Sequence, residues 1–214
     1  MAEIMLSHRP DVACVTEGQT NWLANMHACF STADHGYARV NPNERKVILF
    51  SRNPWTDVDT IGHPDLPPGR FVAATTETPI GPFRFVGVCI PWRAAHVSTG
   101  NRNRTPWQDH KTYLSALRTI IAQLPDNAIV LGDYNQRLPR QGQPSAVAEL
   151  LIDTLGSRLA VMTSGVIEEV ADYAIDHLAC TAHLSVSSLT ALPKVQNDLK
   201  LSDHFGLIVN LQPN

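Results

Sequence analysis

Acidic, amide and imidazole residues recur in this sequence at the ends of apolar stretches. They are Glu17, Asp133 with Asn135, Asp176, and Asp203 with His204. Carboxylate oxygens are the ligands that hard cations such as Mg²⁺ and Mn²⁺ prefer. A carboxylate can also orient a water molecule, and an imidazolium can stabilise a developing negative charge. The set therefore suits metal-assisted hydrolysis at phosphorus.

Each of these residues also has an ordinary structural explanation. Glu17 suits the first turn of a following helix, where the helix dipole favours an acid. Residues 132–135 (Gly-Asp-Tyr-Asn) have a composition that is typical of a turn. Asp176 and His177 fit the alternation of a surface strand, and Asp203 fits a turn before the last strand. Their ordered combination, rather than any single residue, favours a shared site.

Length and charge exclude several classes of protein. The 214 residues include 17 Lys+Arg and 20 Asp+Glu, which gives a formal net charge of -3. This balance argues against the wrapping of long nucleic acid by bulk charge. No apolar run approaches the roughly 20 residues that span a bilayer, and the first residues lack the pattern of a signal peptide. We therefore expect a cytoplasmic protein that does not bind a membrane.

Familiar catalytic and redox motifs are absent from the sequence. It contains no Walker A, GxGxxG, HExxH, GxSxG or EF-hand pattern. The cysteines are widely spaced and form no CxxC pair; they are Cys14, Cys29, Cys89 and Cys180. We expect buried thiols rather than a zinc knuckle or a disulfide framework.

Hydrophobic periodicity predicts the elements that must position these side chains. Helices are expected over 1–9, 19–30, 107–123 and 145–155. Strands are expected over 12–16, 36–40, 46–51, 70–78, 83–90, 128–131, 158–162, 173–180, 183–189 and 205–211. Hairpins mixed with helices favour an α+β layered fold with largely antiparallel pairing. No linker divides the chain, so we expect one domain over 1–214.

Five segments, in order along the chain, resemble the endonuclease/exonuclease/phosphatase superfamily, which has the deoxyribonuclease I-like fold. They are Arg9-Pro-Asp-Val-Ala-Cys-Val-Thr-Glu17, Ile48-Leu-Phe-Ser-Arg52, Ile129-Val-Leu-Gly-Asp-Tyr-Asn135, Tyr173-Ala-Ile-Asp-His177 and Leu201-Ser-Asp-His204. The Gly-Asp-x-Asn and Ser-Asp-His segments are the more specific ones. The resemblance implies a four-layer α/β/β/α sandwich, in which helices lie outside two mixed sheets.

The resemblance also implies a role for each acidic residue. Glu17 would bind the divalent metal, and Asp203 would be a metal ligand or hold a water beside it. Asp133 would orient or deprotonate the attacking water, and Asn135 would hold that carboxylate or the phosphate. The implied cofactor is Mg²⁺ or Mn²⁺.

The same resemblance assigns the imidazole. His204 would stabilise charge on the phosphoryl group in the transition state, and Asp176 would fix its orientation and protonation. The chemistry of the residues agrees, because a nearby anion favours the imidazolium.

The sequence departs from the family pattern before Arg9. The family opens with a strand that ends in Asn, and no such strand or Asn precedes Arg9. Either the start is truncated, which would leave a central position in one sheet vacant, or this branch of the family does without the strand. Exposed strand edges of this kind are prone to association.

A second departure lies in the loop that follows Cys89, where this sequence carries Arg and His. We consider Arg93, His96, Arg102 and Arg104 as substrate-binding residues. Arginine suits bidentate phosphate binding. A solvated loop explains the same residues equally well.

Two functions from different classes follow from these observations. The first is a metal-dependent phosphoester hydrolase for short nucleic acid or a small phosphorylated molecule, either a nuclease (a phosphodiesterase) or a phosphatase. The second is a family member that has lost catalysis and serves as a binding domain, which the missing strand motivates.

Overall fold

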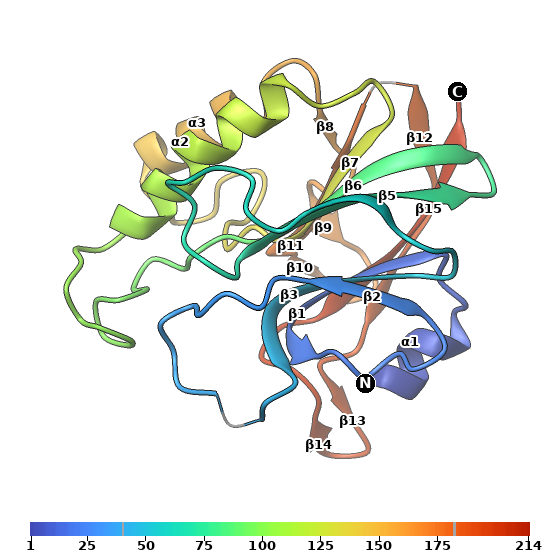
Figure 1. Cartoon of the computed structure of the whole chain (residues 1–214), viewed down its shortest axis with the longest axis horizontal. Coiled ribbons are helices and arrows are strands. Elements are labelled where there is room, and N and C mark those ends of the chain that lie inside the picture. The colour runs from blue at the N-terminus through green and yellow to red at the C-terminus, as the bar shows by residue number, and fades with distance from the viewer. Residues whose placement is uncertain (40, 182) are drawn as a thin grey trace.

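The computed structural model describes residues 1–39, 41–181 and 183–214 (Figure 1). Its helices are α1 (Ala2–Ser7), α2 (Gln108–Ala122) and α3 (Ser145–Leu155). The strands up to α2 are β1 (Val12–Gln19), β2 (His27–Phe30), β3 (Glu44–Ser51), β4 (Thr56–Asp59), β5 (Phe71–Thr78) and β6 (Gly81–Cys89). The later strands are β7 (Ala128–Asp133), β8 (Ala160–Val161), β9 (Val166–Ile167), β10 (Asp172–Tyr173), β11 (Asp176–Cys180), β12 (Leu184–Leu192), β13 (Val195–Gln196), β14 (Leu199–Lys200) and β15 (Gly206–Pro213).

A six-stranded sheet with the order β4-β5-β6-β7-β11-β8 forms the centre of the molecule. Its pairs are antiparallel except for β6 and β7, which run parallel with Cys89 opposite Asp133. A parallel pair needs a crossover connection, and α2 supplies it. Tyr113 and Leu117 of α2 lie in one buried cluster with Val88 and Val130 of the sheet. Figure 1 shows α2 and α3 together on this side.

The sheet β1-β3-β2 packs on the other face of the six-stranded sheet. The alternation of β3 explains how it joins two layers, since successive side chains point to opposite faces. Val47 and Leu49 lie in one cluster with Phe85 of the six-stranded sheet, whereas Ile48 and Phe50 lie in another cluster with α1. The order helices, sheet, sheet, helix confirms the predicted four-layer sandwich.

The second sheet layer is interrupted. In the described part of the chain, β1-β3-β2 forms one sheet and β12-β15 forms another, and every pair in them is antiparallel. One edge of β1 and one edge of β15 therefore lack a strand partner.

The helix predicted over 19–30 is wrong. These residues contain the end of β1, a series of turns and then β2, which pairs with β3. Trp22, Leu23 and Met26 do face the core as a helical spacing predicts, because they pack on Ile48 and Phe50. A series of turns can place apolar side chains on one face with the same spacing as a helix. The spacing therefore predicted which residues are buried, but not the secondary structure that carries them.

Three smaller expectations have different outcomes. Residues 36–39 form no strand, and Val40 of the strand predicted over 36–40 lies outside the described residues. The four cysteines are free, as expected. Within the described ranges, no helix is long and apolar enough to cross a membrane.

Candidate active site

Adjacent strand ends bring the acidic and imidazole residues together. Asp133 is the last residue of β7, Asp176 is the first of β11, and the two are register partners in an antiparallel pair. His204 lies two residues before β15. One ligand atom from each of Asp133, Asp176 and His204 lies within 4.8 Å of the others. The sheet therefore gathers three of the predicted residues into one cluster.

Gly132 allows β7 to pass close to β6 just before Asp133. Its φ is +131°, and a Cβ there would lie 2.1 Å from the carbonyl oxygen of Val88. We expect Gly132→Ala to lower the free energy of unfolding by about 3 kcal/mol or more, because backbone cannot yield as a side chain does. Urea unfolding measures this loss. Gly142→Ala is the matched control, since its φ is +82° but a Cβ meets nothing within 4 Å; equal losses in the two variants would contradict the clash.

His204 lies between two carboxylates. Its Nε2 is 3.0 Å from Oδ2 of Asp176, and its Nδ1 is 2.9 Å from Oδ1 of Asp203. Burial of the ring lowers its pKa, but the hydrogen bond and charge of Asp176, with the charges of Asp133 and Asp203, outweigh this and raise the pKa of His204 to about 9. The ring is therefore an imidazolium at neutral pH. In this structure Asp203, suggested by the sequence as a metal ligand, holds His204.

Asp133 is buried and held by Asn135. The backbone N–H of Asn135 donates to Oδ1 of Asp133 at 2.8 Å, and its Nδ2 donates to Oδ2 at 2.7 Å. Nδ2 of Asn135 also lies 2.9 Å from the carbonyl oxygen of Ile90. Burial and then the charge of Asp176 raise the pKa of Asp133 well above the usual range of a carboxyl, although His204 and Asn135 act against this. Two carboxylates this close favour a cation between them.

The donor set fits a divalent cation. Oδ1 of Asp176 is buried and has no hydrogen-bond partner among the described residues. A buried carboxylate oxygen without a partner is costly, and a metal ion would satisfy it. Asp133 and Asp176 supply the oxygens that such an ion prefers.

The cluster lines a cavity of about 580 Å³. A smaller cavity of about 180 Å³ adjoins it at His204 and Asp203, and its lining includes Arg137 and Lys194. These two cations suit the binding of phosphate oxygens beside the cluster. They come from separate loops, and no local pattern in the sequence marks either of them.

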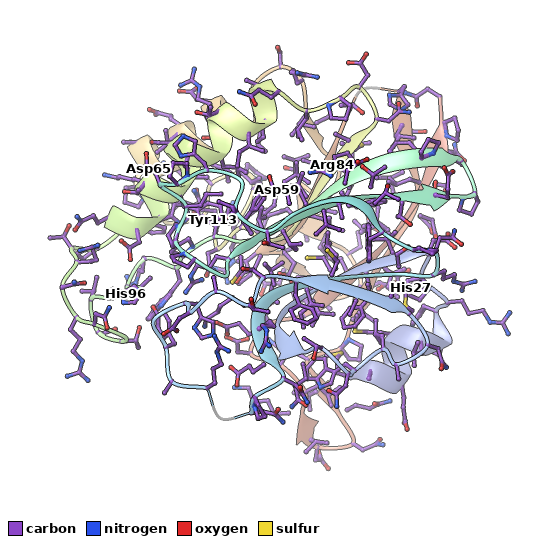
Figure 2. All side chains as sticks on the ribbon, in the orientation of Figure 1. His27, Asp59, Asp65, Arg84, His96 and Tyr113 are labelled. Atoms are coloured by element: carbon purple, nitrogen blue, oxygen red, sulfur yellow. The ribbon has the colours of Figure 1, made fainter. Side chains whose placement is uncertain are left out.

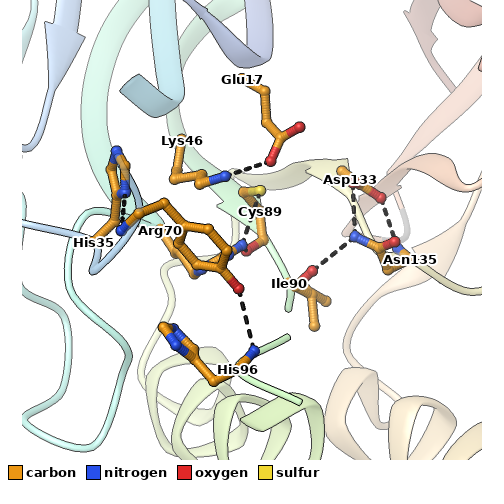
Figure 3. Close-up of polar contacts among 10 residues, drawn as sticks. Glu17, His35, Lys46, Arg70, Cys89, Ile90, His96, Asp133 and Asn135 are labelled. Atoms are coloured by element: carbon orange, nitrogen blue, oxygen red, sulfur yellow. Dashed lines mark hydrogen bonds and ion pairs between the residues drawn. The ribbon is translucent and has the colours of Figure 1, made fainter. Parts of the chain in front are cut away.

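Glu17 lies on the wall of the larger cavity but outside the cluster. Its Oε1 forms an ion pair with Nζ of Lys46 at 2.5 Å. Figure 3 shows the Glu17 side chain directed at Lys46 while Asp133 faces Asn135. The side chain of Glu17 is 61% exposed, whereas that of Lys46 is 10% exposed. Sequence reasoning missed Lys46, because a lysine within an apolar strand gives no sign of its partner.

The structure does not bring the four loop residues proposed for substrate binding to the cluster. The described residues that line the two cavities do not include Arg93, His96, Arg102 or Arg104. Nε of Arg104 pairs with Oδ1 of Asp109 at 2.9 Å. His96 donates its backbone N–H to the Tyr37 hydroxyl at 3.3 Å. Figure 2 shows His96 on the loop that extends away from the sheets.

Comparison by sequence links the chain to one family. A model described as "Endonuclease/Exonuclease/phosphatase family" matches residues 1–204. A search of the curated proteins found no match.

Comparison by structure finds the same fold. A 3' phosphatase from Neisseria bound to a product DNA hairpin has a TM-score of 0.67 at 15% identity, with 98% of this chain and 92% of that chain covered. The endonuclease domain of the telomere-specific retrotransposon TRAS1 has a TM-score of 0.64 at 17% identity, with coverages of 99% and 90%. D. rerio TDP2 complexed with a single-strand DNA product has a TM-score of 0.62 at 14% identity, with coverages of 99% and 91%. At these identities the likeness concerns the fold.

Proposed function

Because the chain belongs to the endonuclease/exonuclease/phosphatase family, we propose that it hydrolyses a phosphoester with the help of a divalent metal ion. The family is hydrolytic, and its enzymes are generally dependent on divalent metals. One observation carries the proposal: Asp133, Asp176 and His204 converge within 4.8 Å on the wall of a cavity. This set combines ligands for a cation, a carboxylate for water and a donor for phosphate.

In the proposed reaction, separate side chains bind the metal ion and activate the water. Asp176, through its buried Oδ1, would hold the ion, and Glu17 is the further carboxylate that we propose for it. A bound Mg²⁺ or Mn²⁺ would act as a Lewis acid on a phosphoryl oxygen. Asp133, kept in place by Asn135, would orient and deprotonate the attacking water.

His204 would stabilise the charge that develops on the phosphoryl group. Asp176 keeps the ring protonated and oriented through the 3.0 Å contact with Nε2. The proton removed from the attacking water would pass to Asp133. The leaving oxygen would take a proton from solvent or from His204. These steps define Asp133 and His204 as the catalytic residues of the proposal.

We propose a short nucleic acid as the substrate, with a small phosphorylated molecule as the other class to test. Two of the solved structures named above hold DNA products. Arg137 and Lys194 in the smaller cavity would bind phosphate oxygens next to His204. The net charge of -3 favours a short site over an extended one.

Removal of metal tests the proposal directly. We expect EDTA to lower hydrolysis of bis-p-nitrophenyl phosphate and of a short DNA hairpin by roughly 100-fold or more, because the ion stabilises transition-state charge. Addition of excess Mg²⁺ or Mn²⁺ should restore the rate. The control variant is Asp153→Asn, an exposed acid on α3 that should respond to EDTA as the parent does. Hydrolysis that persists unchanged in EDTA would overturn the metal dependence.

A second function, a binding domain without catalysis, is favoured by the placement of Glu17. Glu17 is paired with Lys46 rather than directed at the cluster. The second sheet beside the cluster is also interrupted between β1 and β15, so the candidate metal site lacks a fully assembled wall. Calorimetric titration with Mg²⁺ or Mn²⁺ distinguishes the two functions. Heat that saturates at one ion per chain supports the hydrolase, and a silent titration supports the binding domain.

A further inference from the structure

A buried polar network continues from the candidate active site into the helix layer. Gln136, one residue after Asn135, is 2% exposed, and His110 of α2 is fully buried. Nε2 of Gln136 lies 2.8 Å from Nε2 of His110, and Nδ1 of His110 lies 2.7 Å from the carbonyl oxygen of Pro91. Pro91 follows Ile90, whose carbonyl oxygen accepts from Nδ2 of Asn135 (Figure 3). His110 therefore joins the segment that follows Asn135 to the segment that receives its side chain.

The partners of this network determine which atoms donate and which accept. A carbonyl oxygen only accepts, so Nδ1 of His110 carries the ring hydrogen and donates it to Pro91. Burial lowers the pKa of His110 to about 4, although the hydrogen bond to Pro91 acts against this, so the ring is neutral and its Nε2 accepts. Nε2 of Gln136 donates to that atom and, at 3.1 Å, to the carbonyl oxygen of Val147. A flipped amide would set its oxygen against both acceptors, so His110 and Val147 fix the orientation of Gln136.

The backbone of Gln136 is held by a second buried histidine. Nε2 of His177 lies 3.0 Å from the carbonyl oxygen of Gln136 and donates to it. Nδ1 of His177 then accepts from the hydroxyl of Thr163 at 2.9 Å. His177 is 3% exposed and follows Asp176 of the cluster. Gln136 is thus held by one imidazole at its side chain and by another at its carbonyl.

Asn135 depends on this support because its backbone lies in the left-handed region. Its φ is +52°, which is uncommon in residues other than glycine. Such a conformation persists only where the surrounding structure holds it in place. In this conformation Asn135 directs its backbone N–H at Oδ1 of Asp133 and its Nδ2 at Oδ2. A relaxed backbone at Asn135 would withdraw both donors from the carboxylate.

We infer that His110 and Gln136 are positioning residues: the hydrogen bond between them fixes the backbone of Asn135, which in turn holds Asp133 in place as the proposed base. The described residues that line the two cavities include neither His110 nor Gln136, so the pair acts through Asn135. Only the kinetic test of this inference rests on the proposed function, since the hydrogen bonds of Asn135 can be measured without substrate.

Amide hydrogen exchange by NMR tests the positioning without any activity. Gln136→Met keeps the length of the side chain and removes its donors. In EDTA, we expect this variant to speed exchange of the Asn135 N–H by about tenfold or more relative to that of the Tyr134 N–H. The Tyr134 N–H donates to the carbonyl oxygen of Ile175 at 2.9 Å and is the internal reference, because a general loss of stability speeds both amides.

Thr154→Val is the matched control for Gln136→Met. The Thr154 side chain is also 2% exposed, and its hydroxyl donates to the carbonyl oxygen of Leu150 at 2.7 Å within the helix layer. This variant should lose stability but keep the exchange ratio and kcat of the parent. Gln136→Met should lower kcat for bis-p-nitrophenyl phosphate roughly tenfold or more while KM stays within about twofold, because it misplaces the base and not the substrate.

A double-variant cycle tests whether His110 acts through Gln136. His110→Phe removes the acceptor and should lower kcat by at least the same factor as Gln136→Met. Together the two should lower kcat less than about twofold beyond His110→Phe alone, because both break one hydrogen bond. All variants are first checked for cooperative unfolding in urea. The tautomer of His110, read by ¹⁵N NMR on the parent, needs no variant: Nδ1 should carry the hydrogen and Nε2 should carry none.

Contrary results are equally specific. Equal acceleration of the Asn135 and Tyr134 amides, an equal loss of kcat in Thr154→Val, independent effects in the cycle, or a hydrogen on Nε2 of His110 overturns the inference. If the parent hydrolyses no phosphoester, the proposed function fails, whereas the exchange ratio and the tautomer still decide whether His110 and Gln136 position Asn135.

Discussion

Asp133→Asn is expected to lower kcat for phosphoester hydrolysis by roughly 10²–10⁴-fold, because it removes the base from the reaction. The substitution keeps the shape of the side chain, and its Oδ1 can still accept the backbone N–H of Asn135. KM should change far less than kcat, since the phosphate is held by cations. Steady-state kinetics with bis-p-nitrophenyl phosphate at saturating Mg²⁺ measures both.

Stability distinguishes this loss from misfolding. Asp133 is buried beside Asp176, which disfavours its charged form. Replacing it with a neutral amide removes this repulsion but also loses the hydrogen bond that Oδ2 accepts from Nδ2 of Asn135, so the two effects oppose each other and Tm in EDTA should change little. Asp153→Asn is the matched control, because Asp153 is an exposed acid on α3 that lies outside the cluster and lines neither cavity. If Asp133→Asn retains half of the parent's kcat while folded, another group is the base.

The cluster of Asp133, Asp176 and His204 is the part of the candidate site that the sequence predicts best. Asp133 and Asp176 stand at ends of apolar runs, and adjacent antiparallel strands place opposite ends side by side. Their meeting therefore follows from local pattern plus one strand pairing. The sequence marks Gly132 only as part of the Gly-Asp-x-Asn motif. It does not predict the close approach of Gly132 to Val88, because that approach depends on the spacing of β6 and β7.

The remaining features depend on packing between distant segments. The pair of Glu17 and Lys46 is set where β1 and β3 adjoin. Arg137 and Lys194 share a cavity because the loops that carry them both line it beside His204. None of these arrangements leaves a periodic or spaced signal in the sequence. In contrast, the Arg-rich loop after Cys89 has such a signal, but none of its described residues considered for substrate binding lines either of the two cavities at the cluster.

His204→Gln is expected to lower kcat by roughly 10²–10³-fold, since it removes the positive donor to the transition state. It should also change how stability depends on pH in EDTA. The pKa of His204 is about 9 in the folded protein against an ordinary 6.5. The folded state thus holds the proton of His204 more tightly than the unfolded state does. The stabilisation that results is complete below pH 6.5 and is lost as pH rises toward 9.

The parent should therefore lose up to about 3 kcal/mol of unfolding free energy between pH 6.5 and 9, at about 1.4 kcal/mol for each unit of pKa. Asp133 acts in the same direction because its pKa is also raised, so His204→Gln should reduce this fall rather than abolish it. Asp203→Asn is the matched control, since Asp203 is 80% exposed and solvent screens its contact with His204. Urea unfolding across this range measures all three proteins. An unchanged slope in His204→Gln would show that the imidazolium is not what binds the two carboxylates, and the assignment of His204 as the charge-stabilising residue would then fail.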